Sequence, residues 1–138
     1  MRIALAVLVG VVLLAACASG YAAAGMDPSA PESVTVPIGA AGADAVRYVQ
    51  QAATRGGFMV AMTSPGLVTV GPVSIPEDHT VRMMFAVSIL ADSASVRGTV
   101  TDKFRGLENY PIRGNTSGRA AWGWRELTRL ADTLRVRR

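Results

Sequence analysis

Residues 81–103 read VRMMFAVSILADSASVRGTVTDK, and they alternate with a period of two on both sides of a short break at Asp92-Ser93-Ala94. In the first half, every second position is apolar: Val81, Met83, Phe85, Val87 and Ile89. In the second half, Val96, Gly98 and Val100 alternate with Arg97, Thr99, Thr101 and Lys103. Because successive side chains of a strand point to opposite faces, this pattern predicts a long antiparallel hairpin whose last strand has one face in water.

A second hairpin precedes this one. Two apolar runs, 58–63 and 67–70, flank Ser64-Pro65-Gly66. Proline and glycine stand in the order that a type II turn requires, with a fixed φ first and a positive φ second. Pro72 and Pro76 follow, and proline in a strand marks an edge or an end because it donates no ladder hydrogen bond. The two hairpins together predict four strands.

A predicted helix lies on each side of the strands. In 43–55, Ala45, Val46, Val49, Ala52 and Ala53 form one helical stripe, and Gly56 follows as the expected left-handed cap. From Arg119 to about Val136, the stripe is Ala120, Trp124, Leu127, Ala131 and Leu134. The expected fold is therefore α+β with the order α-β-β-β-β-α. A four-stranded antiparallel sheet carries both helices on one face and leaves the other face open.

The start of the chain, residues 1–17, reads MRIALAVLVGVVLLAAC. Arg2 precedes an unbroken apolar run, Ile3 to Ala16, and small residues close it, which is typical of a secretory signal that is removed from the mature protein. A membrane-spanning helix needs about 20 apolar residues, so a span is disfavoured. An ordinary cleaved signal remains an alternative, although it would not need a cysteine.

Leu14-Ala15-Ala16-Cys17 resembles the lipobox of bacterial lipoproteins. This resemblance implies cleavage before Cys17 and attachment of a diacylglycerol to its thiol. Two or more acyl chains hold a protein stably on a bilayer, so the implied partner is a membrane. In that family an aspartate after the cysteine retains the protein in the inner membrane, and this chain has Ala18. We therefore expect a lipid-anchored protein of the bacterial cell envelope, on the periplasmic face of the outer membrane where the organism has one.

The chain then divides into a signal peptide at 1–16, a lipidated N-terminus and flexible tether at 17–37, and a small domain at 38–138. Three prolines interrupt the tether, and a flexible chain of about 20 residues spans roughly 25 Å. Residues 34–36 are an alternative short edge strand. The sequence has one cysteine, so its lipidation leaves none for a disulfide.

From Ala43 to Val136, the element order resembles the helix-grip repeats of the accessory lipoprotein of the outer-membrane barrel-assembly machine. An Ala-rich helix, a glycine-aromatic strand start at Gly57-Phe58, a hairpin, further strands and a closing helix carry the resemblance. It implies a non-catalytic module that binds or assembles with another envelope protein.

The formal net charge is +4, with 14 Lys and Arg against 10 Asp and Glu. Nucleic acid is an unsuitable partner for an exported protein. The positive charge fits anionic lipid headgroups, a cell-wall polymer or an acidic protein surface. An Arg-rich codon usage explains it equally well.

Four residues are candidates for partner binding: Arg105, Tyr110 and Arg113 in the long connection 104–118, and Trp122 at the start of the second helix. Long connections are often functional, and tryptophan and arginine are frequent in binding hot spots. The alternative is structural, with Tyr110 pinning the connection to the domain and Trp122 packing at its edge.

The search for chemistry predicts no enzyme, no metal and no cofactor. The one histidine, His79, follows Glu77 and Asp78 in a polar turn, and adjacent residues cannot all face one metal ion without special backbone geometry. Three functions remain open. The first is an interaction or assembly module, and the second is a carrier of an apolar ligand or lipid between sheet and helices, with the six methionines as adaptable lining. The third is a hydrolase with carboxylates gathered around His79.

Overall fold

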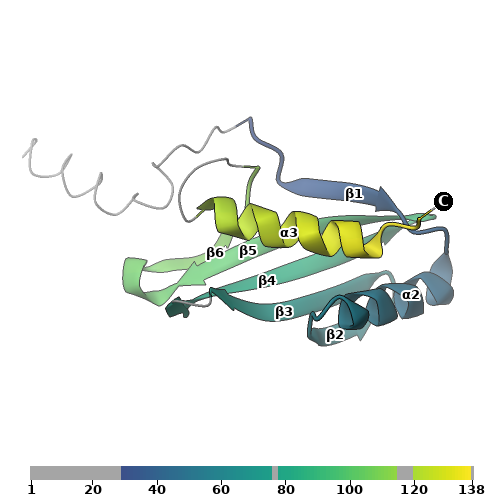
Figure 1. The fold of residues 1–138 in the computed structure, drawn as a ribbon, viewed down its shortest axis with the longest axis horizontal. Coiled ribbons are helices and arrows are strands. Elements are labelled where there is room, and N and C mark those ends of the chain that lie inside the picture. Colours follow the sequence, from purple (N-terminus) through teal and green to yellow (C-terminus); the bar gives the residue numbers. More distant parts are fainter. Residues whose placement is uncertain (1–28, 76–77, 115–119, 138) are drawn as a thin grey trace, which may run out of the picture.

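The structure is a computed structural model that describes residues 29–75, 78–114 and 120–137. It consists mainly of one sheet and two helices (Figure 1). The elements in chain order are β1 (Ser33–Pro37), α2 (Gly42–Arg55), β2 (Val60–Ser64), β3 (Leu67–Ile75), β4 (Asp78–Leu90), β5 (Ser93–Asp102), the 3₁₀ helix η1 (Lys103–Arg105), β6 (Leu107–Pro111) and α3 (Ala120–Leu134). The fold is α+β, as the sequence predicts.

The sheet has six strands, not the four expected, and its order is β1-β5-β4-β3-β2, with β6 also paired to β5. The two additional strands share one edge of β5. β1 pairs with its first half, Ser93–Arg97, and β6 pairs with its second half, between Thr99 and Asp102. An unpaired edge exposes a row of backbone donors and acceptors, and these two short strands satisfy that edge of β5.

The hairpin predicted from residues 81–103 forms the centre of the sheet. β4 and β5 pair continuously from Val81 opposite Asp102 to Leu90 opposite Ser93. The turn is Ala91-Asp92, slightly earlier than the predicted break, and Ala91 adopts a positive φ of 54°. The predicted β2–β3 hairpin also forms, with Ser64 opposite Leu67 and a positive φ of 75° at Gly66.

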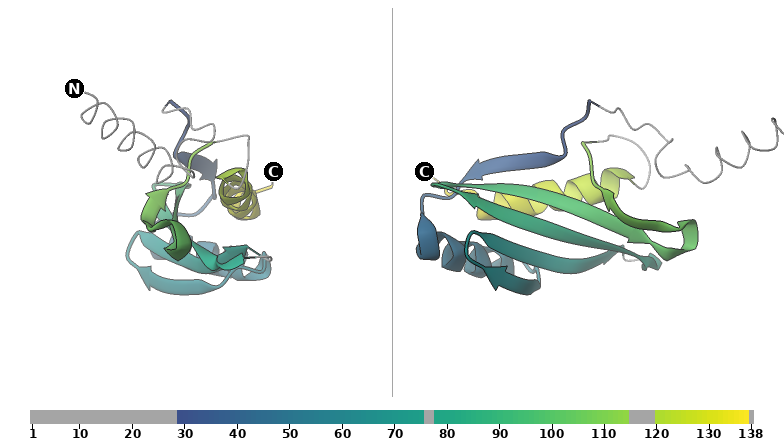
Figure 2. Two further views of the ribbon diagram at one scale, coloured as in Figure 1. Left: turned by 90° about the vertical axis from the view of Figure 1, so that its left-hand side faces the viewer. Right: turned by 180° about the vertical axis from the view of Figure 1, so that it is seen from behind.

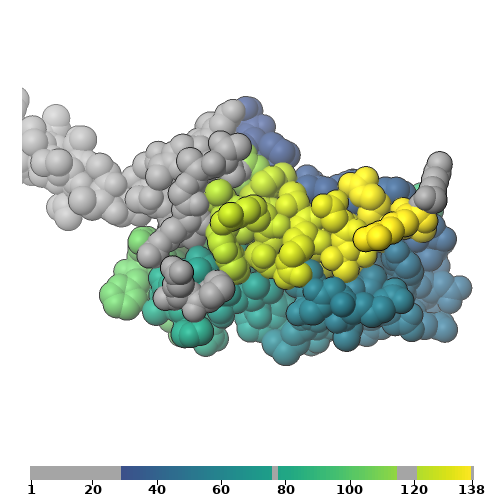
Figure 3. All heavy atoms as spheres, viewed as in Figure 1, coloured from purple at the N-terminus to yellow at the C-terminus, as the bar shows by residue number. Residues whose placement is uncertain are grey.

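Both helices cover the same face of the sheet, as expected. α2 packs on β2, β3 and β4, while α3 packs on β1 and β5 and also contacts α2. Figure 1 shows the helices in front of the strands, and the right view of Figure 2 shows the strands from behind. Figure 3 shows the two helices side by side over this face. Fully buried side chains fill the space between the layers: Phe85, Met83, Leu127, Leu130, Leu134, Val49, Val68 and Val70.

At the C-terminus of α2, the left-handed residue is one position later than the sequence predicts. Gly56 has a φ of −76°, and the left-handed residue is Gly57, with a φ of 81°. Gly57 N donates to Thr54 O at 3.0 Å and Phe58 N donates to Ala53 O at 3.0 Å. These are the two hydrogen bonds of a Schellman motif, which places the left-handed glycine after the cap residue. The motif turns Phe58 into the core, where it is 4% exposed.

Arg129 links the two helices at this corner. Its guanidinium lies 3.9 Å from the centroid of the Phe58 ring and donates to Gly56 O at 3.0 Å. Glu126, one turn earlier on α3, accepts from the same group at 2.7 Å. The arginine therefore ties the end of α2 to the middle of α3.

Candidate functional site

The face of the sheet opposite the helices, here called the open face, carries no helix or strand from the part of the chain that the structure describes. Cross-strand pairing defines its side chains, because residues directly opposite each other share a face. One row across the sheet is Thr35, Ser95, Ser88, Leu67 and Ser64, and the next is Ser33, Arg97, Ala86, Thr69 and Met62.

Hydroxyl groups dominate the open face, and most of its side chains are half-buried. Arg97 is exposed near its centre, and Met62 is 60% exposed at its β2 edge. Small polar side chains on a sheet leave a surface with little relief, on which a partner makes hydrogen bonds as well as apolar contacts. The open face is therefore suited to a polar, non-obligate contact.

A hollow of about 570 Å³ lies at one end of the molecule. Its lining comes from the first turns of α2 and from the β2–β3 and β4–β5 turns: Ala43, Val46, Pro65, Gly66, Ile89 and Ala91. The N-cap of α2 is Ala41, which makes no side-chain hydrogen bond. The hollow opens at the edge between α2 and the sheet, whereas the layer between the sheet and the helices is filled by buried side chains.

The four residues predicted to bind a partner do not converge on one surface. Arg105 lies before β6, and its Nη1 is 2.6 Å from the Asp102 carboxylate. Arg113 lies after β6 and forms an ion pair with Glu32 at 2.6 Å, beside the start of β1. Tyr110 and Trp122 are half-buried and pack against the core.

The other sequence candidates fall in different places. Cys17 lies outside the described residues, as does Glu77. His79 is exposed at the start of β4, and the Asp78 carboxylate accepts hydrogen bonds from the Thr80 backbone N–H and hydroxyl. Within residues 29–75, 78–114 and 120–137, no group of three or more His, Cys, Asp or Glu side chains is placed to hold a metal ion.

Sequence reasoning missed the turn after β5. Asp102 is fully buried, and one of its carboxylate oxygens accepts from Phe104 N at 3.1 Å and Arg105 N at 3.3 Å. The other oxygen holds the Arg105 guanidinium. Gly106 follows with a positive φ of 66°, and Phe104 between them is 88% exposed. An aspartate four residues before a glycine is the available signal, since aspartate caps turns through its side chain.

Comparison of the chain with protein-family models and with curated proteins finds no match. Neither helix of the described part is long and apolar enough to cross a membrane.

Proposed function

We propose that this protein is a membrane-anchored, non-catalytic lipoprotein of the bacterial cell envelope, and that its domain is an interaction or assembly accessory module. In this proposal Cys17 carries the lipid, and residues 18–32 connect it to β1, the first strand of the sheet. The domain works on the periplasmic face of the outer membrane. The resemblance to helix-grip repeats supports the same proposal, and it implies that the partner is a protein of an envelope assembly.

The observation that supports the proposal is that the helices cover only one face of the sheet in the described part of the chain. Both helices cover one face, and the described residues leave the other face open across β1, β5, β4, β3 and β2. A protein–protein contact of standard size needs about 800 Å² from each partner, and the open face extends over five paired strands. Its hydroxyl groups favour a polar partner surface.

The test uses a photo-crosslinking amino acid in the full chain, produced in bacterial cells. One variant places it at Arg97, on the open face, and the control places it at Arg47, which is exposed on α2. We expect Arg97 to yield a crosslink to one protein species that Arg47 does not yield. Ser95→Arg, beside Arg97 on the same face, should remove that crosslink. Identical crosslinks from both positions, or none from Arg97, would contradict the proposal.

A carrier of an apolar ligand or lipid is the second candidate, and the hollow beside α2 favours it. Its volume of about 570 Å³ falls within the range of small-molecule sites, about 300–1,000 Å³. A long-chain fluorescent fatty acid should then bind the protein, and Ala43→Phe, which fills the hollow from α2, should abolish that binding. Binding that persists in Ala43→Phe would exclude the hollow as the carrier site.

A further inference from the structure

The turn between β5 and β6 presents an aromatic side chain to solvent. Phe104, in the middle of η1, is 88% exposed, more than any other large hydrophobic side chain that the structure describes. Single exposed apolar residues are common, so exposure alone assigns no role. The residues that hold Phe104 in place and those around it provide the further observations.

A buried carboxylate holds this turn. Asp102 accepts three hydrogen bonds, from Phe104 N, Arg105 N and Arg105 Nη1, although it is fully buried. Burial of a charge is unfavourable unless the charge is paired and hydrogen-bonded. The pairing to Arg105 meets that condition and fixes the backbone of the η1 tip (Lys103–Arg105). Phe104 therefore projects from a hydrogen-bonded turn.

Two exposed cations, Arg82 and Lys103, lie beside this aromatic group. Phe104 lines a hollow of about 560 Å³ together with His79, Thr80, Arg82, Thr101 and Lys103. Among the described residues, Arg82 and Lys103 form no ion pair. The acidic groups that the structure describes on the same and adjoining elements are Asp102, which is buried, Asp78, which is hydrogen-bonded to Thr80, and the exposed Glu108 on β6.

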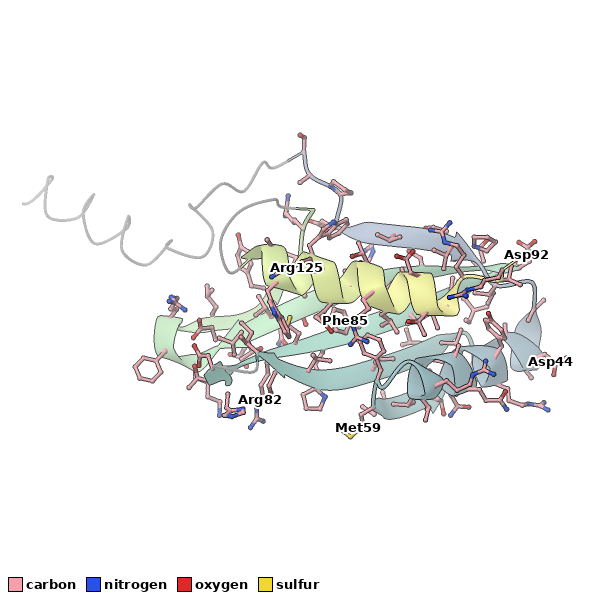
Figure 4. The ribbon with its side chains drawn as sticks, viewed as in Figure 1. Asp44, Met59, Arg82, Phe85, Asp92 and Arg125 are labelled. Atoms are coloured by element: carbon pink, nitrogen blue, oxygen red, sulfur yellow. The ribbon has the colours of Figure 1, made fainter. Side chains whose placement is uncertain are left out.

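Charged side chains lie at both ends of the sheet. Figure 4 shows Arg82 toward the end of the sheet that carries η1, and Asp44 and Asp92 at the opposite end. β1 begins on the η1 side and runs away from it (Figure 1). An aromatic ring that projects among cations is the arrangement that interfacial membrane contacts use, with the ring at the headgroup level and the cations on phosphates.

We propose that the η1 tip docks on a phospholipid surface with anionic headgroups. Phe104 enters the boundary between headgroups and acyl chains, while Lys103 and Arg82 contact lipid phosphates. Docking would orient the domain on the membrane and keep the turn at Leu90 away from it. This inference rests on the proposed function only in that the N-terminal anchor brings the tip to a bilayer.

The test uses the full chain with Cys17→Ser, because the sequence has one cysteine and a fluorescent thiol label can then be placed at one position. One variant carries the label at Glu108→Cys, beside the tip, and the control carries it at Leu90→Cys, at the other end. The vesicles contain brominated phosphatidylcholine, either alone or in equal parts with phosphatidylglycerol. Quenching by bromine reports contact with the bilayer, and flotation separately reports whether the chain is attached.

We expect strong quenching at position 108 in the anionic vesicles, little at position 90, and a decrease at high salt. Phe104→Ser in the Glu108→Cys chain should weaken the contact about tenfold, since burial of a phenylalanine ring corresponds to about that factor. Lys103→Glu should weaken it as well. Phe104 is exposed, so circular dichroism should show an unchanged fold in Phe104→Ser.

The outcomes separate this proposal from the anchor, because Cys17→Ser removes the thiol that would carry the lipid. Equal quenching at 108 and 90 in the anionic vesicles, or no flotation with them, would overturn docking by the tip. An acidic protein surface would then be the partner that fits the cations. The anchor is tested separately, by the intact mass of the wild-type chain.

Discussion

Replacement of Asp102 by alanine should destabilise the domain by about 3 kcal/mol. The substitution removes a fully buried carboxylate that accepts three hydrogen bonds, at 2.6, 3.1 and 3.3 Å. Removal of one partner from a buried ion pair costs about 3–5 kcal/mol. The side chain of Arg105 is 40% exposed, so its charge regains water after the substitution, and the lower end of this range applies.

The measurement is urea unfolding of the chain that begins at residue 17, followed by circular dichroism, with Arg105→Ala as the matched control. Arg105→Ala leaves the carboxylate with its two backbone donors, so we expect it to cost about 1–2 kcal/mol, within the range of one hydrogen bond to a charged group. A loss below about 1 kcal/mol for Asp102→Ala, or an equal or larger loss for Arg105→Ala, would refute the view that the buried carboxylate holds the η1 tip.

Three further substitutions test the packing, each by the same unfolding measurement. Phe85→Ala should cost about 3–5 kcal/mol because the ring is fully buried; a loss below about 1 kcal/mol would contradict its place in the core. Gly98→Ala places a Cβ 2.8 Å from both Phe85 Cδ1 and Ile112 Cδ1, so it should cost about 1–3 kcal/mol, and Ile112→Val should recover part of that loss in the double variant. Arg129→Ala should cost about 1 kcal/mol through the lost stacking on Phe58, and a neutral effect would show that this corner does not stabilise the two helices.

The regular part of the fold was predictable because its signals are periodic. The alternation in residues 81–103 predicted β4 and β5, and the Pro65-Gly66 pair predicted the turn that closes β2 and β3. The apolar stripes of the two helices predicted that they share one face of the sheet. Each of these depends on side chains at regular spacing, which the sequence displays directly.

The strand count was wrong because the two strands that pair with the remaining edge of β5 are short, with five residues each. β1 contains residues 34–36, which the sequence offered as an alternative short edge strand. β6 lies in the predicted connection 104–118, and it forms by pairing with an edge of β5 that local sequence does not reveal. The left-handed residue at the end of α2 was predicted at Gly56 and is Gly57, for a related reason. Both glycines permit a positive φ, and the position with positive φ is the one that lets Phe58 enter the core.

The candidate site was less predictable than the fold. The open face follows from one-sided packing, and the residues that alternate on β5 already indicated its polar side in the sequence. The η1 tip was not predicted. Asp102 and Gly106 are a signal for a turn, but the residues 102–106 do not indicate that Asp102 is buried while Phe104 is exposed. Aspartate is usually exposed and phenylalanine usually buried. The pairing of β6 with β5 reverses these preferences at Asp102 and Phe104.

Lipid attachment at Cys17 is the claim on which the proposed location and function rest most directly. Its test is the intact mass of the protein purified from bacterial membranes, beside a Cys17→Ser variant. We predict that the wild-type chain begins at residue 17 with the added mass of a diacylglyceryl group and fractionates with membranes, while Cys17→Ser remains unprocessed or becomes soluble. Equal fractionation of the two chains with no lipid mass on either would contradict the claim and indicate an exported binding protein without a lipid anchor.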